Sequence, residues 1–280
     1  MAHLLIFGLG YTAGRIAAAL RAHGWQISAT GSAGNIAFAD RNAVLAALGE
    51  VTHVLSSVPP DRASGGDPVL DAYGGTLADK PLFYLSSTGV YGDRAGAWVD
   101  EATPTIAQSG DGRRNARAEA DLAWLEMGAR VFRLPGIYGP GRSAIDRVRE
   151  GKARRIALPG QVFSRVHVDD IMCAVVAALT QDAPPGAYNI GDDLPCSSNE
   201  VTEHACRLLG LPLPPLETLE EANLSEMARG FYMENRRVAN GKAKRVLGWS
   251  PRFATYVEGL ESLFAPQAPA GASAPLASAP

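Results

Sequence analysis

Cysteine and histidine are scarce in this sequence, and neither is arranged for metal binding. Cys173, Cys196 and Cys206 are the only cysteines among 280 residues, and no two of them form a C-x-x-C pair. The five histidines are scattered along the chain. Because metal sites and disulfide frameworks need regularly spaced residues, we expect no metal and interpret the cysteines as reduced, buried small side chains.

Positive charge is not in excess either. The chain has 26 lysines and arginines against 29 aspartates and glutamates, which gives a formal net charge of -3. Such a chain has no basic surface for a phosphate backbone, so nucleic acid is not expected as a partner. No apolar run approaches the roughly 18 residues of a membrane span, and no signal segment precedes the first expected strand. We therefore expect a cytoplasmic protein that does not bind a membrane.

The N-terminal residues form a glycine-rich turn between an apolar strand and an alanine-rich helix. In a G-x-G-x-x-A turn the first glycine allows a tight turn, and the second leaves room over a pyrophosphate. The third position, here Ala13, packs the helix on the strand. The pattern predicts a phosphate-binding turn, and an ordinary glycine-rich turn is the alternative. The residues expected to contact the cofactor here are Gly8, Leu9, Gly10, Tyr11 and Thr12.

The end of the second expected strand, residues 25–30, bears on the choice of cofactor. An acidic residue at this point would bind the ribose of NAD and repel the 2′-phosphate of NADP, and none is present. The hydroxyls of Thr30 and Ser32 could bind that phosphate, with Arg15 or Arg41 supplying positive charge. NADP is therefore the favoured cofactor, and NAD stays possible. The alternative is that Thr30 and Ser32 only shape the turn.

The first half of the chain alternates strands and helices. Residues 35–40 could form a short strand in which Asp40 caps the next helix, and a stronger strand runs through Ser56 and Ser57. This alternation predicts right-handed crossovers and a parallel sheet, whose ligands bind beyond the carboxyl ends of the strands. Ser56 and Ser57 are thereby expected beside the Gly8 turn, as further cofactor contacts.

Later motifs resemble those of a known family. They are Ser86-Ser87-x-x-Val90-Tyr91-Gly92, Arg133-x-x-x-Ile137-Tyr138-Gly139-Pro140-Gly141, Phe163-x-x-Val166-His167-Val168-Asp169-Asp170 and the stretch 242–251. Together with the glycine turn, and in this order, they are similar to the extended short-chain dehydrogenase/reductases, the group of nucleotide-sugar epimerases and dehydratases. The resemblance runs from about residue 4 to about residue 264.

This resemblance implies an α/β fold, a Rossmann-type doubly wound parallel sheet with a smaller C-terminal α/β substrate region. The NAD(P)-binding domain would span residues 1–140, with its sheet completed by later segments, and the substrate-binding region residues 141–264. Residues 265–280 are almost all Ala, Pro, Ser and Gly and are expected to be disordered. Relatives often dimerise through helices of the first domain, so a homodimer is possible.

The family uses a serine to hold the substrate oxygen, here Ser87, and a Tyr-x-x-x-Lys pair for proton transfer. In this sequence Asp111 stands at the tyrosine position and Asn115 at the lysine position. An ionised aspartate is a poor proton donor at neutral pH and asparagine does not titrate, so the usual mechanism is not available in its standard form. Tyr91, Tyr138 and Asp111 are the candidates for a replacement acid. The alternatives are packed turn aromatics for the two tyrosines and a helix cap for Asp111.

The resemblance also places Ser86 and Pro135 against the cofactor. Arg165 would lie over the substrate pocket, where it could meet a phosphate or a carboxylate. His167 stands in an apolar alternation and is expected to be a core residue rather than a catalytic one. Asp169 or Asp170 is expected to cap the helix that follows.

Two functional hypotheses follow from these residues. The first is an NAD(P)-binding oxidoreductase or epimerase/dehydratase that acts on a small polar, nucleotide-sugar-like molecule. The second is a catalytically inactive NADP-binding regulator or sensor, which the missing Tyr-x-x-x-Lys pair favours. The retained serine and the surroundings of Pro135 and Arg165 favour the enzyme.

Overall fold

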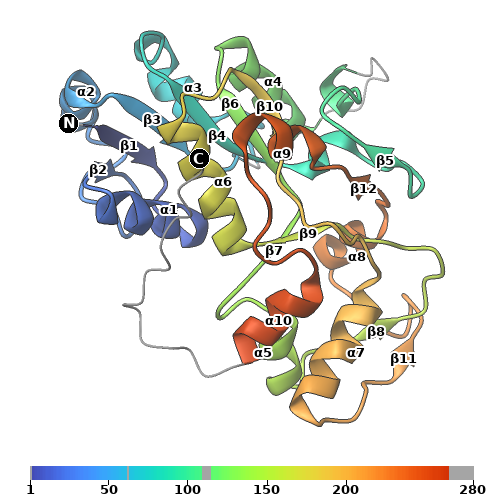
Figure 1. The fold of residues 1–280 in the computed structure, drawn as a ribbon. Coiled ribbons are helices and arrows are strands. Elements are labelled where there is room, and N and C mark those ends of the chain that lie inside the picture. The colour runs from blue at the N-terminus through green and yellow to red at the C-terminus, as the bar shows by residue number, and fades with distance from the viewer. Residues whose placement is uncertain (1, 62, 109–114, 265–280) are drawn as a thin grey trace.

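The computed structural model describes residues 2–61, 63–108 and 115–264 (Figure 1). The C-terminal tail expected to be disordered lies outside these ranges. At the centre is a parallel sheet of six strands in the order β10-β6-β4-β3-β1-β2. Its strands are β1 (His3–Phe7), β2 (Gln26–Ala29), β3 (His53–Ser56), β4 (Leu82–Ser87), β6 (Arg130–Leu134) and β10 (Gly186–Asn189).

The sheet is wound in two directions from β1. This strand pairs with β2 on one side and with β3 on the other, and the chain then continues outward through β4, β6 and β10. The doubly wound α/β fold predicted from the sequence is confirmed. In such a sheet the ligand crevice lies at the carboxyl ends of the strands where the winding reverses, which here is the position of the glycine turn after β1.

Helices cover both faces of the sheet (Figure 1). One layer holds α1 (Tyr11–Ala22), α6 (Val168–Thr180) and α9 (Gly241–Leu247), and the other α2 (Arg41–Glu50), α3 (Pro68–Tyr73) and α4 (Ala116–Glu126). Within β1, Leu4 and Ile6 belong to the first core and Leu5 and Phe7 to the second. The strand is apolar throughout because both of its faces are buried.

The second half of the chain also builds a smaller region, drawn below the sheet in Figure 1. Its helices α5 (Ala144–Arg149), α7 (Ser198–Leu209) and α10 (Tyr256–Phe264) pack around a core of their own. Two short parallel pairs accompany it: β7 (Gly136–Tyr138) with β9 (Arg165–His167), and β8 (Arg155–Ile156) with β11 (Leu216–Glu217). A third pair, β5 (Trp98–Val99) with β12 (Arg237–Val238), packs in a separate small core with Val90 and Tyr91. The remaining helical segments are η1 (Gly74–Thr76), η2 (Thr88–Tyr91), η3 (Ile106–Gln108) and α8 (Glu226–Tyr232).

Two helix caps were predicted, and one of them is wrong. Asp40 caps α2 as expected, because its side chain accepts a hydrogen bond from Ala43 N at 3.1 Å. The cap of α6 is His167, whose Nδ1 accepts from Asp169 N at 3.2 Å. Asp170 instead accepts hydrogen bonds from the backbone N–H groups of residues 252 and 253. A loop more than 80 residues away in the chain therefore takes the carboxylate that was expected to cap the helix.

The segment 35–40 does not form the expected strand. Ile36 makes only an isolated bridge with Thr30. Just before it, the side chain of Asn35 accepts a hydrogen bond from Ala29 N at 2.8 Å. This side-chain bond ties the segment into a turn, so that it does not extend the ladder beside β2.

The cysteines are free thiols, two of them buried and one exposed. Cys196 and Cys206 lie in the interior as expected, but the expectation of burial is wrong for Cys173, which lies on the outer side of α6. Among the described residues, no group of three or more His, Cys, Asp or Glu side chains is placed to hold a metal ion. None of the helices in these ranges is long and apolar enough to cross a bilayer.

Candidate cofactor and substrate site

The glycine turn after β1 is tightly held. Gly8 has a φ of +85°, a conformation that favours glycine. The turn is fastened to the end of β2, because Leu9 N donates to Thr30 O at 2.8 Å and Gly8 N donates to the Thr30 hydroxyl at 3.1 Å. A Cβ at Gly31 would lie 3.0 Å from Leu9 N, so the two loops touch through their backbones.

The space next to the Cα of Gly10 is open, whereas a Cβ at Gly8 would contact neighbouring residues. It stands at the N-terminus of α1 with no side-chain cap, and a Cβ built on it would meet no heavy atom within 4 Å. Behind it, Ala13 is buried against the first core, as expected for the third position of the motif. Uncapped N–H groups at a helix N-terminus, with free space in front of them, fit the pyrophosphate of a dinucleotide.

The groups proposed for the 2′-phosphate of NADP are only in part free to bind it. Thr30 is 1% exposed and its hydroxyl serves the glycine turn, whereas Ser32 is exposed. Arg15 forms an ion pair with Asp169 at 2.6 Å. Arg41 donates to the carbonyl oxygen of residue 72 at 2.7 Å and lies over the ring of residue 73. The end of β2 therefore offers one exposed hydroxyl and no acid.

Other polar groups near the turn brace it. The hydroxyl of Ser57 donates to Gly8 O, and Tyr11 donates to Pro140 O at 3.1 Å. Ser56 is fully buried, and its hydroxyl has no hydrogen-bond partner among the described residues. The turn is thus held by segments of both halves of the chain.

A first cavity, of about 280 Å³, lies at the end of β4. We call it the Ser87 cavity; its other lining residues include Thr88, Pro135, Gly136, Phe163, Ser164, Phe231, Glu234 and Arg236. Ser87, expected at the substrate, and Pro135, expected at the cofactor, line the same cavity. Ser86, the neighbouring serine, points elsewhere and donates to Asp121 at 2.6 Å.

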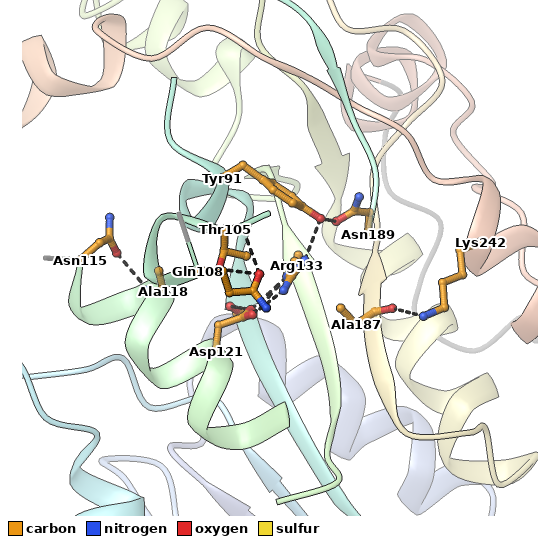
Figure 2. A network of polar contacts seen from close by, with 11 residues as sticks. Tyr91, Thr105, Gln108, Asn115, Ala118, Asp121, Arg133, Ala187, Asn189 and Lys242 are labelled. Atoms are coloured by element: carbon orange, nitrogen blue, oxygen red, sulfur yellow. Dashed lines mark hydrogen bonds and ion pairs between the residues drawn. The ribbon is translucent and has the colours of Figure 1, made fainter. Parts of the chain in front are cut away.

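The Tyr91 hydroxyl lies in a buried polar network that Figure 2 shows. It donates to the Asn189 side chain at 2.8 Å and accepts from Arg133 at 3.0 Å. Arg133 in turn forms an ion pair with Asp121 at 2.6 Å, with both side chains at most 3% exposed. Burial raises the pKa of Tyr91, and the Arg133 charge offsets this only in part. Tyr91 does not line the Ser87 cavity.

The position expected for the family's lysine is a helix cap. Asn115 accepts a hydrogen bond from Ala118 N at 3.0 Å and begins α4 (Figure 2). Asp111, the residue expected at the tyrosine position, lies outside the described residues. In the first turn of this helix, Arg117 donates to the Tyr84 hydroxyl at 2.7 Å.

A second cavity, of about 270 Å³, adjoins the first, and we call it the arginine cavity. Arg142, Arg147 and Arg165 line it, and so does Tyr138. The Tyr138 hydroxyl has no hydrogen-bond partner among the described residues, and burial raises its pKa. A Cβ at Gly259 would overlap it, so the hydroxyl packs against the backbone of α10.

Several lining residues were not found from the sequence. They are Phe231, Glu234 and Arg236 in the Ser87 cavity and Arg142 and Arg147 in the arginine cavity. Arg142 directly follows the Gly-Pro-Gly motif, which is a signal that could have been used. The others lie in segments without a motif, and only the packing of distant elements brings them to the site.

Asp192 is a buried carboxyl whose backbone N–H donates to Arg165 O at 2.8 Å. It is 2% exposed, and its Oδ2 has no hydrogen-bond partner in the described part of the chain. Burial raises its pKa to about 7. Because this value lies above the ordinary aspartate pKa, the folded protein binds a proton that the unfolded chain has lost between about pH 4 and pH 7. Ionisation of Asp192 therefore destabilises the fold as the pH rises through this window.

Asp192→Asn is expected to raise the melting temperature at pH 8 and to leave it nearly unchanged at pH 4, because the variant cannot ionise. Thermal unfolding from pH 4 to pH 8 measures the difference. Asp193→Asn is the matched control, since Asp193 pairs with Lys244 at the surface. A wild type and an Asp192→Asn variant with parallel pH profiles would contradict the prediction.

Comparison with known proteins gives both close and distant relatives. No protein-family model matches the chain. The chain is 30% identical to a 3-diazoavenalumate denitrifying reductase from Streptomyces sp. over 74% of this chain and 63% of the reductase, so it spans just under two thirds of that protein. It is 27% identical to Protein YeeZ of Escherichia coli K12, over 86% of this chain and 94% of YeeZ.

Solved structures extend this comparison. A conserved protein of unknown function from Silicibacter pomeroyi is 41% identical, with a TM-score of 0.81 over 94% of this chain and 98% of that one. The dTDP-glucose 4,6-dehydratase of Bacillus anthracis in complex with NAD is 18% identical, with a TM-score of 0.73 over 94% and 96%. Human epimerase family protein SDR39U1 with NADPH is 15% identical, with a TM-score of 0.73 over 94% and 99%. The last two share the fold of this chain and hold a nicotinamide dinucleotide.

Proposed function

This chain belongs to the same family as the conserved Silicibacter pomeroyi protein, and we propose that it is an NADP(H)-dependent reductase of a small electrophilic compound. One observation carries the proposal. An open dinucleotide turn and the Ser87 cavity lie at the same carboxyl edge of one parallel sheet. That edge is where a cofactor and its substrate meet in doubly wound folds.

The residues of the turn fit a dinucleotide. Gly10 and the N–H groups at the start of α1 would hold the pyrophosphate, and Pro135 would face the nicotinamide. When bound, NADPH supplies a hydride. NADP is preferred over NAD in this proposal because residues 30–33 contain no acid to repel the 2′-phosphate and Ser32 is exposed there.

The side chains of the Ser87 cavity favour reduction over epimerisation or dehydration. The Ser87 hydroxyl can donate a hydrogen bond to the substrate atom that becomes negative. The carboxylate in the described lining, Glu234, is paired with Arg236 at 2.5 Å, so the guanidinium engages the oxygen that would otherwise act as a base. Oxidising an alcohol needs a base, whereas a strongly electrophilic acceptor takes a hydride first and its proton later from water. The Streptomyces relative is named for the reduction of a diazo compound, which is a substrate of this kind.

A second candidate is an NADP-binding regulator without turnover. The observation that favours it is Asn115, which caps α4 at the position expected for the catalytic lysine. Such a protein would bind the cofactor as tightly as an enzyme does. The two candidates therefore differ in turnover and not in cofactor affinity.

We expect NADPH to raise the melting temperature more than NADH, and we expect NADPH oxidation with an electrophilic carbonyl, quinone or diazonium compound.

Ser87→Ala should lower kcat roughly 100-fold, because one hydrogen-bond donor to developing charge is lost. The rise in melting temperature with NADPH should be unchanged in this variant. Thermal-shift titration and NADPH absorbance measure both effects.

Ser86→Ala is the matched control for this experiment. It removes the neighbouring hydroxyl, which faces Asp121 and not the cavity, so stability should fall while kcat stays. Tight NADPH binding without turnover across the whole panel would leave the regulator as the better description. A larger rise in melting temperature with NADH than with NADPH would contradict the proposed preference for NADP.

A further inference from the structure

The arginine cavity gathers three arginines that have no ion-pair partner among the described residues. None of Arg142, Arg147 and Arg165 forms an ion pair within the described ranges. Arg165 is 9% exposed, and its guanidinium donates to the sulfur of Cys196 at 2.7 Å. Desolvation and the charge of Arg165 lower the pKa of Arg147, so the two guanidinium groups act on each other. Cations gathered in this way are stabilised by a bound anion.

Two carboxyl groups act on these arginines through their charge, Asp192 on Arg165 and Asp146 on Arg147, but neither forms an ion pair with them. Asp146 precedes Arg147 on α5, but its Oδ2 accepts hydrogen bonds from the backbone N–H of Ser143 at 2.8 Å and from the Ser143 hydroxyl at 2.7 Å. The bond from Ser143 N, together with the one that Asp146 N donates to the Ser143 hydroxyl oxygen at 3.2 Å, forms the capping box of α5. The Asp146 carboxylate is therefore hydrogen-bonded at the N-terminus of α5, and the guanidinium groups are free to bind an anionic ligand.

The other walls of the cavity are flat and mostly apolar. Phe163 and Phe231 stack in parallel with their ring centroids 4.5 Å apart, and Tyr256 lies under Arg165. The Ser164 oxygen accepts a hydrogen bond from Val238 N at 2.9 Å, so only its proton is left for a ligand. A sugar needs many neutral hydrogen-bonding partners, and these walls instead offer aromatic faces and positive charge.

The arginine cavity and the Ser87 cavity are neighbours along one groove. Both are lined by Gly136, Phe163, Ser164 and Phe231. At about 270 and 280 Å³ each is slightly below the usual range for a drug-sized ligand. One compact molecule can therefore place its anionic group among the arginines and its reactive group beside Ser87.

The structure assigns a substrate class to this groove: a compact, planar compound with one oxyanion, held by Arg142, Arg147 and Arg165, and a reducible group at its opposite end. This inference rests on the proposed reductase function and makes it more specific. A carboxylate and a phosphate both suit arginine, and the experiment below separates them.

The test is calorimetric titration of the full chain, with NADP present, using cinnamate, phenyl phosphate, cinnamamide, inorganic phosphate and UDP-glucose as probes. Cinnamate or phenyl phosphate should bind at least ~10-fold more tightly than neutral cinnamamide, because charged hydrogen bonds to arginine are lost in the amide. The tighter of the two anions identifies the oxyanion. Arg147→Gln should weaken that binding at least ~10-fold, and Arg142→Gln is the second variant if the first does not fold.

Arg149→Gln is the matched control, since Arg149 lies on the same helix but does not line the cavity. Equal affinity for cinnamate and cinnamamide, tighter binding of UDP-glucose, or unchanged affinity in both cavity variants would overturn the inference. If inorganic phosphate binds as tightly as phenyl phosphate, the claim that the substrate is planar is refuted, because the phenyl ring then adds no affinity. Binding is measured without turnover. If the anions bind but NADPH is not oxidised, the proposed reductase function is refuted and the proposed ligand class is kept. Turnover of neutral compounds that Arg147→Gln leaves unchanged refutes the substrate class alone.

Discussion

Gly10→Asp is expected to weaken NADPH binding roughly 100-fold or more, equivalent to about 2.7 kcal/mol, while the protein stays folded. The side chain would enter the open space in front of α1, and its negative charge would oppose the pyrophosphate at the helix N-terminus. The backbone of Gly10 has a φ of −103° and a ψ of −159°, which other residues also adopt, so the fold has no reason to change. Calorimetric titration with NADPH measures the loss, and thermal unfolding reports on the fold.

Gly49→Asp is the charge-matched control for this variant. Gly49 is an exposed residue near the end of α2, and a Cβ on it also meets no heavy atom within 4 Å. It should retain the affinity of the wild type. An unchanged affinity in Gly10→Asp would mean that the dinucleotide does not bind at this turn.

Asp121→Ala is expected to destabilise the fold by about 3–5 kcal/mol, because it leaves the Arg133 guanidinium buried without its ion-pair partner. The same change removes the acceptor of the Ser86 hydroxyl. A loss of this size corresponds to a fall of roughly 10 °C in melting temperature for a chain of this length. Denaturant unfolding followed by circular dichroism measures it.

Two further variants separate a lost ion pair from a general effect of mutating α4. Glu126→Ala removes an exposed carboxylate from the same helix and should stay within about 0.5 kcal/mol of the wild type. The double variant with Asp121→Leu and Arg133→Met should be more stable than the sum of its single changes, since no charge is left uncompensated. An Asp121→Ala variant within about 1 kcal/mol of the wild type would show that the pair contributes little.

This network also bears on the search for a replacement acid. From sequence alone Tyr91 was a candidate because it follows Ser87 by four residues. In the fold its hydroxyl is shared by Arg133 and Asn189, 42 and 98 positions further along the chain. Proximity in sequence could not reveal those partners, because β6 comes beside β4, and β10 beside β6, only in the assembled sheet.

The sequence by itself determined the elements whose causes are local. The Gly8 turn follows from glycine's access to positive φ, and the open position of Gly10 follows from its missing side chain. The α2 cap follows from Asp40, whose carboxylate accepts from an N–H three residues further along the chain. The doubly wound sheet was also predictable, because alternating apolar strands and helices permit few topologies.

Only the tertiary structure decided the chemistry of the site. It paired Arg15 with Asp169, turned Thr30 toward the glycine turn, and gathered Arg142, Arg147 and Arg165 around one cavity. Each of these contacts depends on which distant segment of the chain the fold places beside a charged or polar group. Buried polar groups must find partners wherever the fold brings them, so their roles are fixed by packing across the whole chain and not by neighbours in the sequence.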